Sequence, residues 1–190
     1  MSEIFVAACI QQHNESSGEA LDVGANRGIY TEMLLQKFSK VYAFEPHPEN
    51  VIYLHQKFKL HPKLEIVPKA VSNVTGKTLL QINPHNYGGH TLSSKVAAHP
   101  EWGFTEKKEI EIETVTLDEF CEGKNIQFMK VDIEGAEDFI FEGATKTLSK
   151  PDLNIVIEVH KEVDLNKLFK FFKSFDFRIY GLGLVIAGLS

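Results

Sequence analysis

The sequence is poor in cysteine, in arginine and in long apolar runs, and each shortage narrows the range of functions. Its two cysteines, Cys9 and Cys121, lie far apart and lack metal-ligand spacing, so we expect free thiols in a cytoplasmic protein. Arg27 and Arg178 are the only arginines, which limits bidentate clamps on phosphate or carboxylate groups to two positions. The apolar runs near the two ends are too short to span a membrane, so we expect no membrane partner.

Basic residues are also outnumbered by acidic ones. The chain has 20 Lys and Arg against 26 Asp and Glu, a formal net charge of −6 at pH 7. This balance disfavours bulk electrostatic capture of nucleic acid, and we expect no nucleic-acid partner. A length of 190 residues with 43% apolar side chains suits one domain with a real core. We therefore predict a single domain over residues 1–190, with an N-terminal helix and linker at 1–18.

The order of the predicted elements indicates an α/β fold. Apolar runs typical of buried strands occur at 20–23, 40–45 and 64–67, and helical patterns separate them. Near-continuous apolar strands of this kind are typical of a parallel sheet that is covered on both faces. Four further core strands are expected at 126–132, 153–159, 177–180 and 184–189. The sequence thus predicts a doubly wound, mostly parallel, seven-stranded sheet.

A β excursion is expected between the third and fourth core strands. Residues 77–82 and 108–115 have strand patterns, and the second of these alternates strictly between Ile or Thr and Glu. Residues 83–107 lie between them, and a segment of this length without clear structure is typical of a functional loop. We expect it to cover the substrate, the alternative being an ordinary surface excursion. Its candidates for contact with a sugar or aromatic ring are His85, Tyr87, His90 and Trp102.

A glycine-rich loop follows the first core strand. The strand ends near Asp22, and the loop from Gly24 to Gly28 leads into a helical pattern. In an open α/β sheet such a loop lies at the C-terminal strand edge, where ligands bind, and the free N–H groups of the helix start favour an anion. The loop lacks the second and third glycines of G-x-G-x-x-G, and the chain has no Gly-Lys-Ser/Thr. The ligand is therefore expected to lack a pyrophosphate.

An acid 21 residues beyond Gly24 narrows the ligand further. Glu45 ends the second strand, at the position where an acid accepts hydrogen bonds from a ribose diol. A ligand with a ribose, no pyrophosphate and a zwitterionic end fits S-adenosylmethionine (SAM). Its amino and sulfonium charges would favour Asp22. The alternative is that Asp22 and Gly24 close a strand turn for backbone reasons only.

Six short motifs then occur in a fixed order. They are DVGANRG at 22–28, FEPHP at 44–48, KAVS at 69–72, TLD at 116–118, MKVDIEGAE at 129–137 and EGA at 142–144. Together they resemble the FkbM family of SAM-dependent methyltransferases, and the resemblance covers roughly residues 20–160. It implies the Rossmann-like class I methyltransferase fold, SAM as the cofactor and S-adenosylhomocysteine (SAH) as the product. It also implies O-methylation of a hydroxyl on a small molecule, a sugar or a glycan.

The resemblance assigns roles to the matching residues. Glu45 would hold the ribose, Pro46 would shape the adenine side, and Ala70 would contact the adenine. Asp132, at the end of the fourth strand, would face the methionine or the methyl group. The methionine half of SAM would be lined by Asp22, Gly24, Ala25, Asn26 and Gly28.

Transfer to an alcohol requires a base, because the hydroxyl must lose its proton at or before attack. Polar side chains at the ends of the fourth and fifth strands share one edge of the sheet: Asp132, Glu134, Glu158 and His160. We expect His160 to be the base, since its ordinary pKa suits proton uptake near neutral pH and a neighbouring carboxylate would orient it. Asp132 and Glu158 are the other catalytic candidates.

Other interpretations of these residues and of the whole chain stay open. His160 could simply begin a polar loop, or it could share a divalent ion with Asp132 and Glu158, which the spacing favours no more than base catalysis. We predict no metal site. The alternative functions are an N- or RNA methyltransferase, which lacks support because no Asn/Asp-Pro-Pro-Tyr/Phe motif is present, and a catalytically silent SAM-binding module. A second copy of the chain, in a homodimer, would be one way to close the substrate side.

Overall fold

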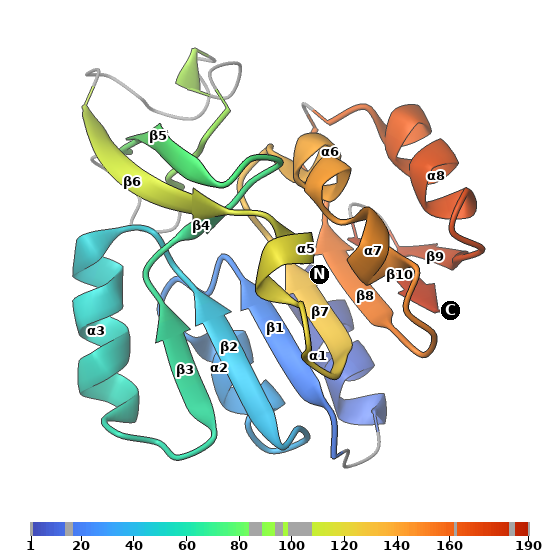
Figure 1. Ribbon diagram of the computed structural model, residues 1–190, viewed down its shortest axis with the longest axis horizontal. Coiled ribbons are helices and arrows are strands. Elements are labelled where there is room, and N and C mark those ends of the chain that lie inside the picture. Colours follow the sequence, from blue (N-terminus) through green and yellow to red (C-terminus); the bar gives the residue numbers. More distant parts are fainter. Residues whose placement is uncertain are drawn as a thin grey trace.

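The computed structural model describes residues 2–13, 17–83, 89–93, 97–98, 108–161, 163–182 and 185–189. At its centre is a seven-stranded sheet with the order β3-β2-β1-β7-β8-β10-β9 (Figure 1). The first five strands in this order are parallel, and β10 runs antiparallel to both β8 and β9. The bounds are β1 (Glu19–Val23), β2 (Lys40–Phe44), β3 (Leu64–Val67), β7 (Ile126–Val131), β8 (Asn154–Glu158), β9 (Arg178–Leu182) and β10 (Val185–Leu189). The predicted α/β fold with a mostly parallel sheet is confirmed.

Helices cover both faces of this sheet, because alternate strand residues point to opposite faces. On β1, Leu21 and Val23 belong to the core under α5–α8, whereas Ala20 belongs to the core under α1 and α2 (Figure 1). Ala43 of β2 packs with Leu54 of α3 on the α1 and α2 side. The bounds are α1 (Ser2–Gln12), α2 (Ile29–Leu34), α3 (Pro48–Phe58), α5 (Leu117–Phe120), α6 (Glu137–Ile140), α7 (Thr145–Leu148) and α8 (Leu165–Lys173).

One helical segment differs from the sequence pattern. The single helix suggested by the apolar residues after 134 is divided into α6, a 3₁₀ turn (Phe141–Gly143) and α7. Gly143 lies so close to the backbone at Ser72 and Asn73 that a Cβ there would come within 3.1 Å of them. Thr116 caps α5 by accepting from the backbone N–H of Glu119 at 3.2 Å, as the sequence predicts. No described helix is long and apolar enough to cross a membrane.

A second, three-stranded sheet stands over the C-terminal ends of β1–β3 (Figure 1). Its order is β4-β6-β5, from β4 (Ala70–Val71), β5 (Gly76–Gln81) and β6 (Glu109–Val115). In β6, Ile112 and Thr114 are buried, whereas Glu111 and Glu113 form exposed ion pairs with lysines. Of the expected substrate loop, the structure describes residues 83, 89–93 and 97–98. His85, Tyr87 and Trp102 lie outside the described residues, as do residues 14–16 of the expected linker.

Candidate active site

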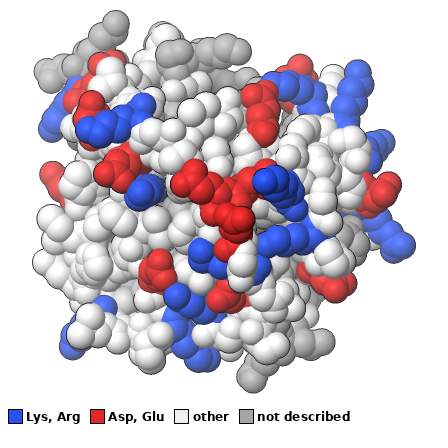
Figure 2. Space-filling model, viewed as in Figure 1, with Lys and Arg blue, Asp and Glu red and all other residues white. Residues whose placement is uncertain are grey.

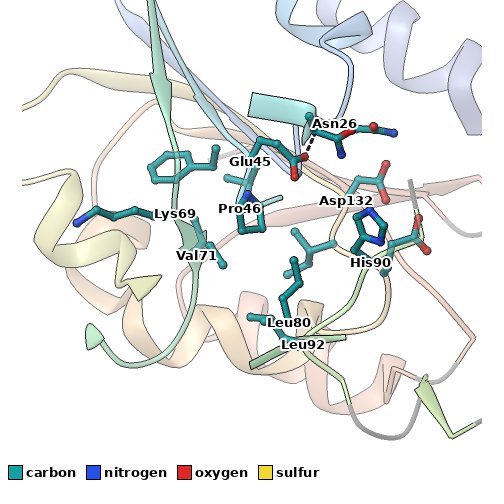
Figure 3. A pocket seen from close by; sticks show the side chains of 16 residues that line it. Asn26, Glu45, Pro46, Lys69, Val71, Leu80, His90, Leu92 and Asp132 are labelled. Atoms are coloured by element: carbon teal, nitrogen blue, oxygen red, sulfur yellow. Dashed lines mark hydrogen bonds between the residues drawn. The ribbon is translucent and has the colours of Figure 1, made fainter. Parts of the chain in front are cut away.

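Two cavities meet at the C-terminal edge of β1 and β7. The Glu45 cavity, shown in Figure 3, is lined on one side by Glu45, Pro46, Ala70, Leu80 and His90. The Glu158 cavity is lined on its far side by Arg27, Tyr30, Lys130, Glu158 and His160. Both cavities share the same four residues: Gly24, Asn26, Asp132 and Glu134. A ligand in one cavity would therefore meet a ligand in the other at the ends of β1 and β7.

The loop after β1 is shaped by residues that accept a left-handed backbone. Gly24 has a φ of +79°, and a Cβ there would lie 1.9 Å from the carbonyl oxygen of Asp132, so only glycine allows this approach to β7. Asn26 also has a positive φ, and its side-chain amide oxygen is buried without a hydrogen-bond partner among the described residues. Gly24 and Asn26 line both cavities, whereas Ala25 lines the Glu158 cavity alone, and their contact with the methionine half of SAM stays a prediction.

Gly28 lies where α2 packs against α3. It precedes α2 with a φ of +72°, and a Cβ there would lie 2.5 Å from the Phe58 ring and 2.8 Å from the Leu54 side chain. It is not among the residues that line the two cavities. The structure thus gives Gly28 a packing role, since it allows α2 to pack closely on α3, and its contact with the cofactor stays a prediction.

The Glu45 carboxylate is buried at the end of β2, where it accepts hydrogen bonds from the loop after β1 and from the segment before α3. Its Oε2 accepts from the Asn26 N–H at 2.8 Å (Figure 3), and its Oε1 accepts from the His47 N–H at 2.8 Å. Burial raises its pKa to about 7, although these two N–H groups and the Asn50 side chain favour the charged form. With three donors on its four lone-pair sites, the carboxylate keeps one lone pair for a ligand in the cavity. Pro46 and Ala70 line the same cavity, as predicted for the adenine side.

Asp22 lies beneath the loop, away from the cavities. It is completely buried, its Oδ2 accepts from the Thr31 hydroxyl at 2.6 Å, and its Oδ1 lies 3.5 Å from the Lys130 Nζ. It is not among the residues lining either cavity. This corrects its predicted direct contact with SAM: Asp22 shares the α2 face of β1 with Ala20, so it anchors α2 and a buried cation.

That cation, Lys130, is the functional residue that the sequence reasoning missed. Its Nζ donates to the Gly24 carbonyl at 3.1 Å and lies 3.5 Å from both Asp22 Oδ1 and Asp132 Oδ2. Burial lowers its pKa, but the charges of Asp132 and Asp22 outweigh burial and raise it above the ordinary value. A lysine inside an otherwise apolar strand run was the available signal, because a buried lysine requires ionic partners.

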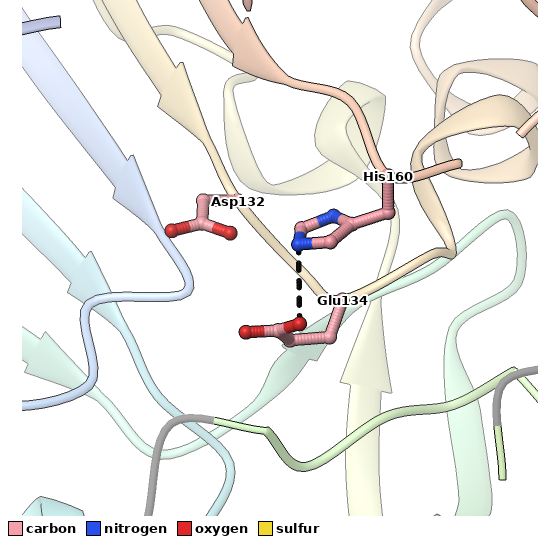
Figure 4. Close-up of side chains that lie close together, drawn as sticks. All are labelled: Asp132, Glu134 and His160. Carbon is pink, nitrogen blue, oxygen red and sulfur yellow. Dashed lines mark ion pairs between the residues drawn. The ribbon is translucent and has the colours of Figure 1, made fainter. Parts of the chain in front are cut away.

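His160 lies between two carboxylates at the end of β8. Its Nε2 is 3.1 Å from Glu134 Oε2 (Figure 4), and its Nδ1 is 2.7 Å from Oε1 of the completely buried Glu137. Burial lowers the pKa of His160, but its hydrogen bonds to Glu134 and Glu137 outweigh burial and raise it to about 11. The imidazole is therefore protonated at neutral pH and has no free lone pair. This corrects the predicted base role of His160.

Glu134 stands where the two cavities join. It has a φ of +55°, rare for a residue with a side chain, and Gly135 follows at +90°. Burial raises the pKa of Glu134, as do the charges of Asp132 and Glu137, while His160 acts in the opposite direction. A carboxylate with a raised pKa is a better proton acceptor than an ordinary one.

Asp132, Glu134 and His160 also have the spacing of a metal site. One ligand atom from each lies within 4.8 Å of the others (Figure 4). The cluster includes Glu134 in place of Glu158, which we had grouped with Asp132 and His160. Each member already has a charged partner: Lys130 for Asp132, and Glu134 and His160 for each other. Glu158 lines its cavity without a hydrogen bond or ion pair to the described part of the chain.

Comparison with known proteins places this geometry in a family. A profile of the methyltransferase FkbM domain matches residues 22–179. A structure of the methyltransferase FkbM from Methylobacillus flagellatus is 18% identical, with a TM-score of 0.64 over 92% of this chain and 44% of that chain. The present chain thus spans less than half the length of that relative. The sequence matches none of the curated proteins with which it was compared.

Two further structures share the fold over nearly their whole lengths. An rRNA methylase from Streptococcus thermophilus is 12% identical, with a TM-score of 0.58 over 100% of this chain and 96% of that one. A protein described as a methyltransferase from Streptococcus mutans, in complex with SAH, is 13% identical, with a TM-score of 0.56 over 100% and 98%. At such identities the likeness shows the fold alone.

Proposed function

This chain belongs to the methyltransferase FkbM domain family, and we propose that it transfers the methyl group of SAM to a hydroxyl of a small molecule, a sugar or a glycan. One observation carries the proposal. The Glu45 cavity and the Glu158 cavity join at Asp132 and Glu134, so a donor in the first would meet an acceptor in the second. Methyl transfer is an in-line displacement, which requires such an arrangement of two reactants.

The Glu45 cavity has the polar groups that SAM requires. Glu45 offers its remaining lone pair to a ribose hydroxyl, and the unpartnered amide oxygen of Asn26 offers an acceptor to the amino group. Gly24 keeps the loop backbone against β7, where a side chain would collide. Pro46 and Ala70 supply apolar contact for the adenine. When bound, SAM supplies an electrophilic methyl group on a sulfonium.

Glu134 is the proton acceptor that the geometry favours. It reaches both cavities, its pKa is raised by burial, and the protonated His160 holds it in place at 3.1 Å. In the proposed reaction the acceptor O–H bond would break as the O–CH₃ bond forms, and the proton would pass to a Glu134 oxygen. The S–CH₃ bond of SAM would break at the same time, its electron pair would stay on the sulfur, and SAH would leave. Asp132 faces the same junction with its Oδ2 3.5 Å from Lys130 Nζ, while Glu158 binds the acceptor.

The charges of the Glu158 cavity favour a hydroxylated acceptor over a nucleic acid. Three carboxylates line it, from Asp132, Glu134 and Glu158, and three cations line it as well: Arg27, Lys130 and the protonated His160. This near-balance offers carboxylate acceptors to hydroxyl groups but no net positive charge to phosphates. Figure 2 shows acidic and basic side chains interspersed over the face seen there, without a continuous basic track. The likeness to the rRNA methylase therefore does not indicate an RNA substrate for this chain.

The test separates binding from chemistry. We would measure SAH binding by calorimetry and methyl transfer from labelled SAM to a panel of sugars and phenols, with and without EDTA. For Glu134→Gln we expect SAH affinity within a few-fold of wild type and transfer slowed by about 10²–10⁴-fold, the usual effect of losing a general base.

Glu111→Gln, on the exposed strand face of β6, is the matched control and is expected to change neither quantity. Tight SAH binding without transfer to any acceptor would support a silent binding module instead. Unchanged transfer by Glu134→Gln would remove the proton-acceptor role. Loss of transfer in EDTA, restored by Mg²⁺, would show that Asp132, Glu134 and His160 bind an ion.

A further inference from the structure

His90 belongs to the segment expected to cover the acceptor, yet it lines the Glu45 cavity and not the Glu158 cavity (Figure 3). Its ring stacks on that of His47, with centroids 4.2 Å apart and an interplanar angle of 29°. His47 follows Glu45 by two residues and donates its backbone N–H to that carboxylate. His90 therefore lies beside the predicted ribose and adenine positions.

The hydrogen bond of one ring nitrogen fixes the chemical state of the other. Nδ1 of His90 accepts from the backbone N–H of Asn83 at 3.1 Å, so Nδ1 carries a lone pair. A histidine with a lone pair on Nδ1 is the neutral tautomer that has its proton on Nε2. Burial, reinforced by His47, lowers the pKa of His90 to about 4, so this neutral form persists at physiological pH.

The Nε2–H of His90 is then a donor without an acceptor. Nε2 is buried and has no hydrogen-bond partner among the described residues. A buried donor without a partner is unfavourable, and such groups in native structures are often completed by a ligand or by water.

We propose that His90 binds the adenosine part of SAM by donating its Nε2–H to an acceptor atom of the nucleoside. This inference rests on the proposed SAM-dependent function. The adenosine is favoured over the methionine end because His90 shares its cavity with Pro46 and Ala70 and stacks on the residue that follows Pro46. Adenine and ribose both offer lone pairs to such a donor.

The segment that carries His90 is held in place on two sides. Thr91 exchanges two backbone hydrogen bonds with Gln81 of β5, at 2.9 and 3.2 Å. The Thr91 hydroxyl also donates to the Glu134 carbonyl oxygen at 2.6 Å. His90 is thus positioned before a ligand arrives, and less ordering entropy opposes binding than for a mobile loop.

Calorimetry with SAH and with 5′-methylthioadenosine, which lacks the amino acid end, tests the proposal. His90→Phe keeps a ring for stacking but removes the donor, and we expect it to weaken both ligands by a similar factor of about ten. His90→Gln can place an amide N–H near the position of Nε2 and should restore most of the affinity. His55→Phe, on the exposed face of α3, is the matched control and should bind as wild type does.

Wild-type affinity of His90→Phe for both ligands would overturn the proposal, and so would a loss confined to SAH. Failure of the wild-type protein to bind SAH would instead refute the proposed function. If His90→Phe does not fold, as judged by circular dichroism, ¹⁵N NMR of histidine-labelled wild type decides. An Nε2–H tautomer whose signal shifts with 5′-methylthioadenosine supports the proposal, and an unshifted signal overturns it.

Discussion

Lys130 is a buried cation that contacts three separate parts of the site. It contacts the Gly24 carbonyl, Asp22 beneath the loop and Asp132 at the cavity junction. Removing one partner of a buried ion pair leaves the others charged and desolvated, which costs far more than the pair contributes in isolation. The arrangement of the loop against β7 therefore depends on a residue that lines only the acceptor side of the site.

We expect Lys130→Met to lower the free energy of unfolding by about 3–5 kcal/mol, because Asp22 would stay buried without its cation. Urea denaturation followed by circular dichroism measures this. Lys77→Met breaks an exposed pair with Glu111 and should leave the free energy of unfolding nearly unchanged. Equal effects of the two substitutions would show that the buried ion pair stabilises the protein no more than the exposed pair does.

Glu45 makes cofactor affinity depend on pH. With its pKa raised to about 7 by burial, the carboxylate is only partly ionised in the free protein at neutral pH. The groups facing it are the N–H groups of Asn26 and His47, the Asn50 side chain and the negative Asp22. The charged form accepts the ribose hydroxyls better, so ligand binding should release a proton from Glu45 near neutral pH.

The expected result is that SAH affinity rises by about tenfold between pH 6 and pH 8, the change in the ionised fraction of a group with a pKa near 7. Calorimetry in buffers of different ionisation enthalpy would detect the released proton. Glu45→Gln should bind weakly and show little pH dependence over this range. A flat profile for the wild type would contradict the assignment of Glu45 to the ribose.

At the scale of elements, the sequence predicts where the strands end, but it does not predict on which face of the sheet each side chain lies. Apolar runs located the parallel strands, and Gly24, Glu45 and Asp132 follow them at the cavity edge as predicted. The side chain of Asp22 lies on the α2 face of the sheet, where it accepts from Thr31 and lies beside its register partner Lys130. Register between strands distant in sequence depends on packing of the whole sheet, which no local pattern records.

The sequence also does not show which side chains pair with His160, because these contacts depend on how distant segments pack together. Glu134 and Glu137 belong to the turn and helix after β7, and His160 follows β8. The sequence placed Glu134 and His160 at one edge, but it could not tell that the carboxylates of Glu134 and Glu137 would engage both ring nitrogens. The proton affinity of a histidine depends on such contacts, so its ordinary pKa suggested a base where the structure has a cation.

The contact between α2 and α3 can be tested with two glycines of equal backbone conformation. Gly28 and Gly123 both have a φ of +72°, but only Gly28 would place a Cβ against neighbouring atoms, those of Phe58 and Leu54. Substitution by alanine imposes similar backbone strain at both sites, so the difference reports packing. Gly28→Ala should be less stable than Gly123→Ala by about 1–3 kcal/mol in thermal or urea unfolding. Equal losses would show that α3 moves away freely.

The whole molecule combines a widespread methyltransferase fold with a surface of mixed charge. The rRNA methylase from Streptococcus thermophilus shows that this fold serves nucleic-acid substrates as well. What separates the two uses is the electrostatic field around the site, because phosphate contacts dominate nucleic-acid affinity. Here the net charge is −6, and the acceptor cavity has no excess of positive charge, because three carboxylates line it beside Arg27, Lys130 and His160.

We therefore expect the protein to bind RNA weakly and without a preference for structure. Fluorescence anisotropy with a labelled RNA hairpin at 50 mM salt should show no saturation below about 10⁻⁴ M protein, the weak end of non-specific binding. Methyl transfer to a neutral oligosaccharide or phenolic acceptor should not depend on the salt concentration, since no counterions are released when such an acceptor binds. Tight RNA binding that falls steeply with salt would require a basic surface outside the face in Figure 2, and would favour an RNA substrate over a hydroxylated small molecule.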